Sequence, residues 1–307
     1  MGYRRKALVT GGSGFIGGCL ANELRSIGWS VTILDKTLGT DITDFDTVME
    51  KVKGQDVIFH LAAQADIRKS LTNHYSDLSQ NLYGTLNLLE AMKHNHVKDL
   101  VFASSSAVYG EATVTPTPET YAPSQTSLYG ASKLACESYA QAFSQFMPLR
   151  FWAFRFSNVI GEGCKRGVIW DFVHKLKENP KRLEILGDGK QSKEYVHVSD
   201  VVSGMLEAFY LGKEGVYNIG HHTQTTVDQV ADLVIEEMGL TDVTRQYSGG
   251  KRGWVGDNPE VILSIDKLEN LGWKPKVSSD EAIRRTVRWT LLKSEAAPVS
   301  VPHGGVL

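Results

Sequence analysis

Gly11-Gly-Ser-Gly-Phe-Ile-Gly17 stands between an apolar run at residues 7–9 and a stretch, residues 15–24, whose apolar side chains have helical spacing. Glycines at 11, 14 and 17 permit a tight turn, a close approach of backbone to a diphosphate, and close packing of helix on strand. The helix N-terminus would offer unpaired N–H groups and partial positive charge to phosphates. Glycine triplets also occur in purely structural turns, so the prediction of a phosphate loop depends on this setting.

An acidic residue closes the next predicted strand, residues 31–34. Asp35 lies 18 positions after Gly17. A carboxylate at this point accepts hydrogen bonds from the hydroxyls of an adenosine ribose and repels a 2′-phosphate. We therefore predict that the chain binds NAD, although Lys36 next to it keeps NADP open.

The first half of the chain alternates short apolar runs with helical patterns. This alternation predicts an α/β fold with a doubly wound parallel sheet of the Rossmann type. The expected strands are residues 7–9, 31–34, 57–59, 100–102 and 151–156, and the expected helices include residues 15–24, 78–92 and 128–143.

The second half predicts a smaller mixed lobe, interwoven with the first domain. Residues 201–209 and 227–238 have helical apolar faces, and Thr226 with Gln229 forms a predicted capping box. Ser278 with Glu281 repeats this pattern before residues 282–289. We predict a Rossmann domain of residues 1–160 with 195–222, a substrate lobe of 161–194 and 223–294, and a disordered tail, 295–307.

Composition excludes several classes of function. The 307 residues include 33 basic and 35 acidic ones, a formal net charge of −2, so no general surface for nucleic acid is expected. No apolar run reaches the roughly 18 residues of a membrane span. Cys19, Cys136 and Cys164 are too few and too scattered for a disulfide framework or a metal site. We expect a cytoplasmic protein without metal.

Tyr129-Gly-Ala-Ser-Lys133 places a phenol and an ammonium on one helix face, at positions i and i+4. Ionising a phenol of pKa about 10 at pH 7 costs about 4 kcal/mol, and a lysine and a cationic nicotinamide ring nearby would reduce that cost. An ordinary exposed helix pair is the alternative. Just upstream, Ser104, Ser105 and Ser106 end a predicted strand, where open α/β sheets bind ligands; there they could equally form a turn.

Taken together, these motifs resemble the extended short-chain dehydrogenase/reductase superfamily, and within it the nucleotide-sugar epimerases of the UDP-glucose 4-epimerase type. The resemblance extends over about residues 6–289. The matching motifs lie at residues 10–17, 60–64, 81–90, 104–110, 129–133, 155–158, 187–189, 198–200 and 252–257.

The resemblance implies a catalytic set in which Tyr129 is the base, Ser105 binds the 4-hydroxyl of the sugar, and Lys133 tunes Tyr129 and binds the nicotinamide ribose. Asp41 and Ile42 would flank the adenine. The implied cofactor contacts are Gly11, Gly14, Phe15, Ile16, Gly17, Asp35, Lys36, Asp41, Ile42, Leu61, Ala62, Ala63, Gln64, Asn81 and Ser104, together with Tyr129 and Lys133.

The resemblance also implies a substrate side. Asn158, Lys193 and Arg252 would meet a diphosphate, and Asp257 would bind the nucleotide ribose or brace Arg252. The full implied set is Ser106, Asn158, Val168, Ile169, Lys193, Tyr195, Arg252 and Asp257, with Val168 and Ile169 against the nucleobase. The chain departs from the family at Glu162, in a loop where relatives usually have proline, and at Lys193, where many have arginine.

The predicted reaction is C4 epimerisation of a UDP-sugar through a transient 4-keto sugar. Related 4,6-dehydratases carry Asp-Glu after the catalytic hydroxyl residue, whereas this chain has Ser106 and Ala107, which are not acids or bases at neutral pH. A dehydratase, another NAD-dependent oxidoreductase, and a non-catalytic NAD-binding protein remain alternatives. By analogy with relatives, helices 78–92 and 128–143 would form a homodimer interface.

Overall fold

The computed structural model describes residues 4–253, 258 and 260–295. Asp257 and the tail expected beyond Glu295 lie outside this part of the chain. Among the described residues, no helix combines the length and apolarity that a membrane crossing requires.

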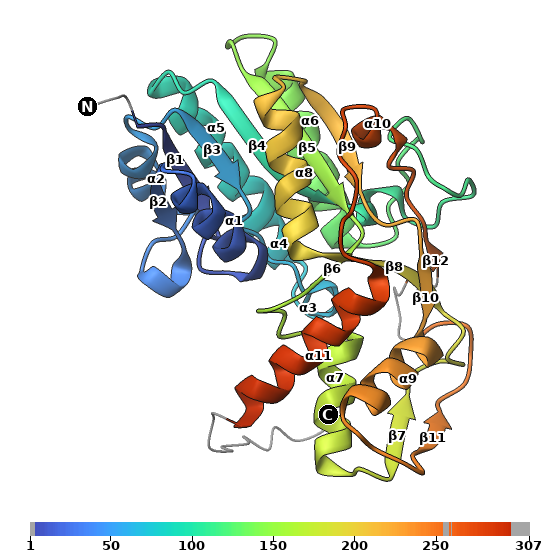
Figure 1. Cartoon of the computed structure of the whole chain (residues 1–307). Coiled ribbons are helices and arrows are strands. Elements are labelled where there is room, and N and C mark those ends of the chain that lie inside the picture. Colours follow the sequence, from blue (N-terminus) through green and yellow to red (C-terminus); the bar gives the residue numbers. More distant parts are fainter. Residues whose placement is uncertain (1–3, 254–257, 259, 296–307) are drawn as a thin grey trace.

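A six-stranded parallel sheet forms the larger part of the molecule (Figure 1). Its order is β2-β1-β3-β4-β5-β9, so the chain moves outward from β1 in one direction to β2 and then in the other to β3. In open α/β sheets, ligands bind outside the carboxyl ends of the strands where the order reverses, which here are β1 and β3. The strands are β1 (Lys6–Thr10), β2 (Ser30–Leu34), β3 (Val57–His60), β4 (Asp99–Ser105), β5 (Arg150–Phe156) and β9 (Gly215–Ile219).

Helices cover both faces of this sheet, which confirms the doubly wound α/β prediction. One buried apolar cluster joins the sheet to α1 (Phe15–Ser26) and α8 (Val198–Tyr210). A second cluster, on the other face, joins it to α2 (Phe45–Val52), α5 (Gly84–His94) and α6 (Leu128–Phe143).

A smaller lobe lies below the carboxyl edge of the sheet in Figure 1. Its own apolar cluster is formed mainly by α7 (Val168–Glu178), α9 (Val227–Glu237) and α11 (Ser279–Glu295). Two small sheets complete the lobe. The first consists of β6 (Asn158–Ile160), β8 (Ser192–His197), β10 (Gln224–Thr226) and β12 (Glu260–Val261). The second consists of β7 (Arg182–Ile185) and β11 (Thr244–Tyr247). After the first part of the lobe, the chain returns to the large sheet with α8 and with β9. The residue boundaries of the two predicted domains stay a prediction.

Both predicted helix starts are found, with different capping. The Thr226–Gln229 capping box is present at α9. At α11, the Ser278 hydroxyl accepts from the Glu281 N–H, but the Glu281 carboxylate pairs with Arg285 one turn later.

The helix expected at residues 78–92 is divided. After α3 (Ile67–Ser70) and α4 (Tyr75–Asp77), the chain forms the π-helical turn η2 (Leu78–Tyr83) before α5. The sequence did not predict this division because the apolar residues keep helical spacing through residues 78–92. The short 3-10 turns η1 (Lys36–Leu38) and η3 (Ser106–Tyr109) and the helix α10 (Asp266–Glu269) complete the elements.

Glu194 on β8 is a buried acid with an incomplete set of partners. Its side chain accepts the Leu263 N–H at 3.0 Å, while Oε2 has no hydrogen-bond partner within the described residues. Burial raises the pKa of Glu194 to about 8, although backbone N–H groups of Leu263 and His221 oppose the shift. The folded protein therefore holds this proton at neutral pH.

Glu194→Gln should flatten the dependence of stability on pH. Since the unfolded acid loses its proton near its ordinary pKa of 4.5, the wild type should lose about 1.4 kcal/mol of unfolding free energy per pH unit between roughly pH 5 and 8 from this group. Urea titrations of both proteins from pH 5.5 to 8.5 measure the effect. Parallel curves would contradict the assignment.

Candidate active site

The glycine-rich turn after β1 has no room for side chains. A Cβ on Gly11, whose φ is +68°, would lie 2.7 Å from the Ala62 nitrogen, and one on Gly17 would lie 2.2 Å from the Gly11 oxygen. The N-cap of α1 is Gly14, which has no side chain to cap the helix. The first turn of α1 therefore fits a diphosphate in the way predicted from sequence.

The Asp35 carboxylate connects the end of β2 to the phosphate loop. It accepts the Ser13 N–H at 3.0 Å and both the N–H and the hydroxyl of Thr37, at 3.0 and 2.8 Å. Each carboxylate oxygen has more than one lone pair, so ribose hydroxyls can still be accepted. Lys36 forms an ion pair with Asp41 at 3.0 Å, which weakens it as a partner for a 2′-phosphate.

His60, at the end of β3, links the strands to the helices behind them. The Thr10 hydroxyl accepts the Leu61 and Ala62 N–H groups, so its own proton goes to His60 Nδ1 at 2.7 Å. His60 Nε2 then donates to the Thr85 hydroxyl at 2.9 Å. Burial lowers the pKa of His60 to about 3, with the Lys133 charge adding to the shift, so the ring is neutral.

Asn81, carried by the π-helical turn, joins the loop after β3 to α6. Its side chain accepts the Gln64 N–H at 2.7 Å and donates to the Gln64 carbonyl at 3.1 Å and to the Ser132 hydroxyl at 2.8 Å. Ser132 in turn donates to the Tyr129 carbonyl at 2.8 Å. Asn81 thus positions the predicted cofactor loop; its direct contact with a cofactor stays a prediction.

Tyr129 lies in the first turn of α6, and Ser105 ends β4. Burial raises the pKa of the Tyr129 phenol, whereas the positive charge of Arg166 and a hydrogen bond with Ser105 lower it. Ser105 ends β4, and its hydroxyl also accepts the Ala107 N–H at 3.2 Å. A substrate hydroxyl placed at this point would face the phenol and a second hydroxyl.

Lys133 is buried on the same helix, and burial lowers its pKa to about 8. Nζ donates to the Ala103 carbonyl at 2.7 Å and lies 6.0 Å from the centroid of the Tyr129 ring. The remaining protons of the ammonium are free to reach a ribose. The leading charge that lowers the pKa of Tyr129 is that of Arg166, a residue that the sequence did not single out.

Ser104 has a partner in the core that the sequence did not indicate. Its hydroxyl is hydrogen-bonded to Glu137, which also forms a buried two-point ion pair with Arg155, at 3.1 and 2.7 Å. The Arg155 guanidinium lies 4.8 Å from the Tyr109 ring centroid. The Ser104 proton is therefore engaged in the core, and the contact of Ser104 with a cofactor stays a prediction. Glu137 could not be singled out because its partners lie far away in sequence.

The expected adenine and nucleobase contacts are largely packed side chains. Ile42 is buried against Gly84, and Ile169 and Tyr195 are buried in the lobe cluster, with Val168 packed beside them. Their proposed ligand contacts stay predictions. Ser106 starts η3, next to Ser105.

The predicted diphosphate residues lie on three segments of the lobe. Asn158 on β6 donates to the Glu194 carbonyl at 3.1 Å, and Lys193 on β8 faces Thr225 in the strand register. Arg252 forms a two-point ion pair with Glu111, at 2.7 and 3.0 Å, and both side chains are about half exposed. Glu111 is a further residue that the sequence did not single out.

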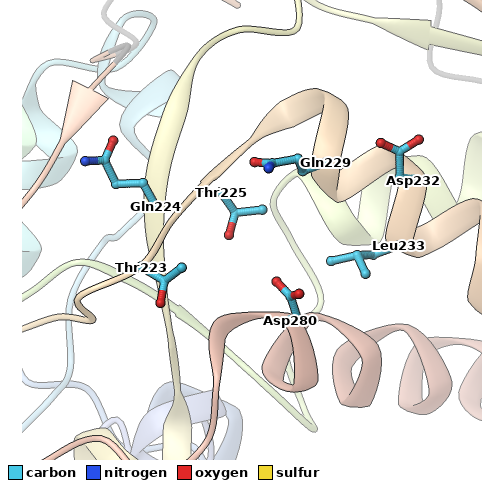
Figure 2. Close-up of a pocket in the computed structure, with 7 residues that line it drawn as sticks. All are labelled: Thr223, Gln224, Thr225, Gln229, Asp232, Leu233 and Asp280. Carbon is cyan, nitrogen blue, oxygen red and sulfur yellow. The ribbon is translucent and has the colours of Figure 1, made fainter.

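A separate hollow of about 290 Å³ lies between β10, α9 and the start of α11 (Figure 2). One of its carboxylates, Asp232, pairs with Arg245. The hollow lacks the phenol and lysine of the site above, and we assign no chemistry to it. Its lining is Thr223, Gln224, Thr225, Gln229, Asp232, Leu233 and Asp280.

Comparison with known proteins decides the family. The model of the NAD dependent epimerase/dehydratase family matches residues 7–220. The chain belongs to this family. NAD is therefore the cofactor, as Asp35 predicted.

The chain is similar to members of the family that are named as epimerases and to members that are named as dehydratases. A putative UDP-glucose 4-epimerase of Methanocaldococcus jannaschii is 35% identical, covering 92% of this chain and 97% of the relative. Human dTDP-D-glucose 4,6-dehydratase is 27% identical, covering 94% and 90%. The crystal structure of UDP-glucose 4-epimerase with UDP-glucose from Thermotoga maritima has a TM-score of 0.85 and 32% identity, covering 94% of this chain and 99% of that one.

Gly17→Ala should abolish retention of NAD and destabilise the fold by roughly 1–3 kcal/mol, because the added methyl meets the backbone oxygen of Gly11. Gly18→Ala is the matched control: its Cβ would lie 3.6 Å from the Gly12 oxygen, an ordinary contact. Thermal unfolding and the NAD content of each purified protein measure both effects. Equal NAD content in the two variants would contradict this geometry.

Proposed function

We propose that the chain interconverts the C4 epimers of a UDP-linked hexose of the UDP-glucose and UDP-galactose type, with NAD retained through the cycle. The observation that carries the proposal is the position of Tyr129 and Lys133 on α6 at the carboxyl end of β4, where Lys133 Nζ donates to the Ala103 carbonyl at 2.7 Å and the strand ends at Ser105. Bound NAD supplies the acceptor, and later the donor, of one hydride at C4.

In the forward half-reaction, Tyr129 takes the proton of the 4-hydroxyl as the C4–H bond breaks, and the C4–O bond becomes a carbonyl. Ser105 donates a hydrogen bond to the same oxygen. After the 4-keto sugar presents its other face, Tyr129 returns the proton to that oxygen while hydride returns to C4. The product then differs from the substrate only in configuration at C4.

The residues that follow Ser105 favour epimerisation over loss of water. A 4,6-elimination requires a base for the proton on C5 and an acid for the leaving hydroxyl. Ser106 and Ala107, which open η3 beside the site, provide neither at neutral pH. A dehydratase stays the second candidate because relatives of that activity cover most of the chain.

We assign the diphosphate to Arg252, Lys193 and Asn158, and the nucleobase to the start of α7 at Val168. The Arg252 guanidinium is held by Glu111 in a two-point geometry that a phosphate can replace. A diphosphate would therefore compete with Glu111 for Arg252.

We also propose that the protein is a cytoplasmic homodimer. The surface formed by α4, η2, α5 and α6 is apolar and hollowed, with about 390 Å³ of space. Tyr75 is 79% exposed there, which is large for an aromatic side chain left in water. The lining residues are Tyr75, Leu78, Ser79, Leu82, Tyr83, Leu86 and Tyr139. The three cysteines are free thiols, which suits a reducing compartment.

Tyr129→Phe tests the proposal. The substitution removes one oxygen, so the fold and bound NAD should survive while turnover of UDP-galactose falls about 10²–10⁴-fold, the usual contribution of general acid–base catalysis. Tyr210→Phe, at the exposed end of α8, is the control and should keep full turnover. Turnover of Tyr129→Phe within a few-fold of wild type would refute the proposed role, and a 4-keto-6-deoxy sugar as main product of the wild type would favour the dehydratase.

A further inference from the structure

The loop of residues 161–167, which joins β6 to α7, touches both segments that border the predicted cofactor site; we call it the crossing loop. On one side, a Cβ on Gly163 would lie 3.2 Å from the ring of Phe15, the first residue of α1 after the glycine-rich turn. On the other side, the Arg166 guanidinium donates to the Ala65 carbonyl at 3.1 Å, in the loop after β3. The crossing loop therefore spans from one segment to the other.

The two segments that the crossing loop connects are neighbours at the carboxyl edge of the large sheet. A Cβ on Gly11 would lie 2.7 Å from the Ala62 nitrogen, so the glycine-rich turn packs directly on the loop after β3. Both segments contain predicted NAD contacts, Phe15 in the first and Gln64, the neighbour of Ala65, in the second. An NAD molecule that contacts both segments would lie where the crossing loop connects them.

The crossing loop is ordered by contacts within itself. Cys164 is 5% exposed, and its N–H donates to the Gly161 carbonyl at 3.1 Å. Its thiol donates to the Arg166 carbonyl at 3.4 Å. Because these contacts connect the start of the loop to Arg166, a side chain that holds the start also helps to hold Arg166 in place.

Glu162 attaches the start of the crossing loop to the N-terminus of α8. His197 is 4% exposed, and its Nδ1 accepts the Ser199 N–H at 3.3 Å and lies 2.7 Å from the Ser199 hydroxyl. Since Nδ1 is an acceptor, the proton of the neutral imidazole is on Nε2, which donates to the Glu162 carboxylate at 2.9 Å. This contact requires an oxygen at the end of side chain 162, but it does not require a negative charge.

We propose that Glu162 is a positioning residue for the cofactor: through His197 it keeps the crossing loop seated across the NAD site and thereby slows the release of NAD. The inference depends on NAD as the cofactor, which follows from the family, and not on the reaction at C4. When the loop lifts, its contacts with Phe15 and Ala65 are lost together. The proline expected at position 162 from the resemblance has no side-chain oxygen, so this attachment is particular to the present chain.

Exchange of bound NAD measures this role without any sugar substrate. Each purified holoprotein is mixed with an excess of deuterium-labelled NAD, and mass spectrometry follows the labelled fraction of the protein-bound NAD. Glu162→Ala should exchange about tenfold faster than the wild type, the effect of losing one hydrogen bond to a charged group that only the seated loop makes. Glu162→Gln should stay within about threefold of the wild type, because its side-chain carbonyl accepts the same proton. Glu178→Ala, which removes an exposed glutamate at the other end of α7, is the control and should exchange at the wild-type rate.

Arg166→Ala tests the second contact of the crossing loop at an exposed side chain, where the substitution leaves the core intact. Loss of the hydrogen bond to Ala65 should accelerate the exchange by about 2- to 10-fold. Lys165→Ala is the matched control, because it removes the neighbouring exposed charge of the same loop and should not change the rate. Thermal unfolding of each variant shows whether its fold is retained.

A folded Glu162→Ala protein, or an Arg166→Ala protein, that exchanges NAD at the wild-type rate would overturn the inference. Exchange as fast in Glu162→Gln as in Glu162→Ala would overturn it too, since the hydrogen bond to His197 would then not be what holds the loop. Equal acceleration in either control variant would have the same consequence. A failure of the proposed function would appear separately, as turnover that survives Tyr129→Phe.

Discussion

The side-chain amide of Asn81 is the contact on which the geometry of the site depends. It is 2% exposed and hydrogen-bonded on both sides, to the backbone of Gln64 and to Ser132 on the helix of Tyr129. Asn81 belongs to the π-helical turn η2, residues 78–83, which has more residues per turn than an α-helix. Such turns are frequent at functional sites. If these partners were absent, the buried amide would destabilise the folded protein by the desolvation free energy of each unpaired group. Asn81 therefore fixes the loop after β3 relative to α6, the helix that carries Tyr129.

The surroundings of the Tyr129 phenol then determine how readily it loses its proton. Burial disfavours the phenolate of Tyr129 and the ammonium of Lys133 alike, raising one pKa and lowering the other to about 8. A nearby positive charge favours the phenolate and opposes the effect of burial. Lys133 Nζ lies 6.0 Å from the centroid of the Tyr129 ring. The buried Glu137–Arg155 pair contributes differently: Glu137 is hydrogen-bonded to Ser104 at the end of β4, next to Ser105.

Local patterns in the sequence predicted the parts of this architecture that depend on local physics. The glycine turn, the five expected strands, α6 and the Thr226–Gln229 cap follow from periodicity and capping, and all are present. Strand β9 was missed because Gly-Val-Tyr-Asn-Ile is short and includes a glycine and an asparagine, although Tyr217 and Ile219 are buried. The π-helical turn was missed because its apolar spacing is that of a helix. Glu111, Glu137 and Arg166 could not be found, because their partners lie 141, 18 and 101 positions away. The hydrogen bond of Ser104 to Glu137, 33 positions away, could not be found from the sequence for the same reason.

The fate of the hydrogen on C4 tests the central claim most directly. UDP-galactose carrying deuterium at C4 is incubated with the purified protein in ordinary water, without added NAD, and the UDP-glucose formed is examined by mass spectrometry and nuclear magnetic resonance. If one bound cofactor removes and returns the same hydride while Tyr129 handles the hydroxyl proton, all of the deuterium stays at C4 of the epimer. Deuterium lost to water, or found on C6 of a 4-keto-6-deoxy sugar, would contradict the account.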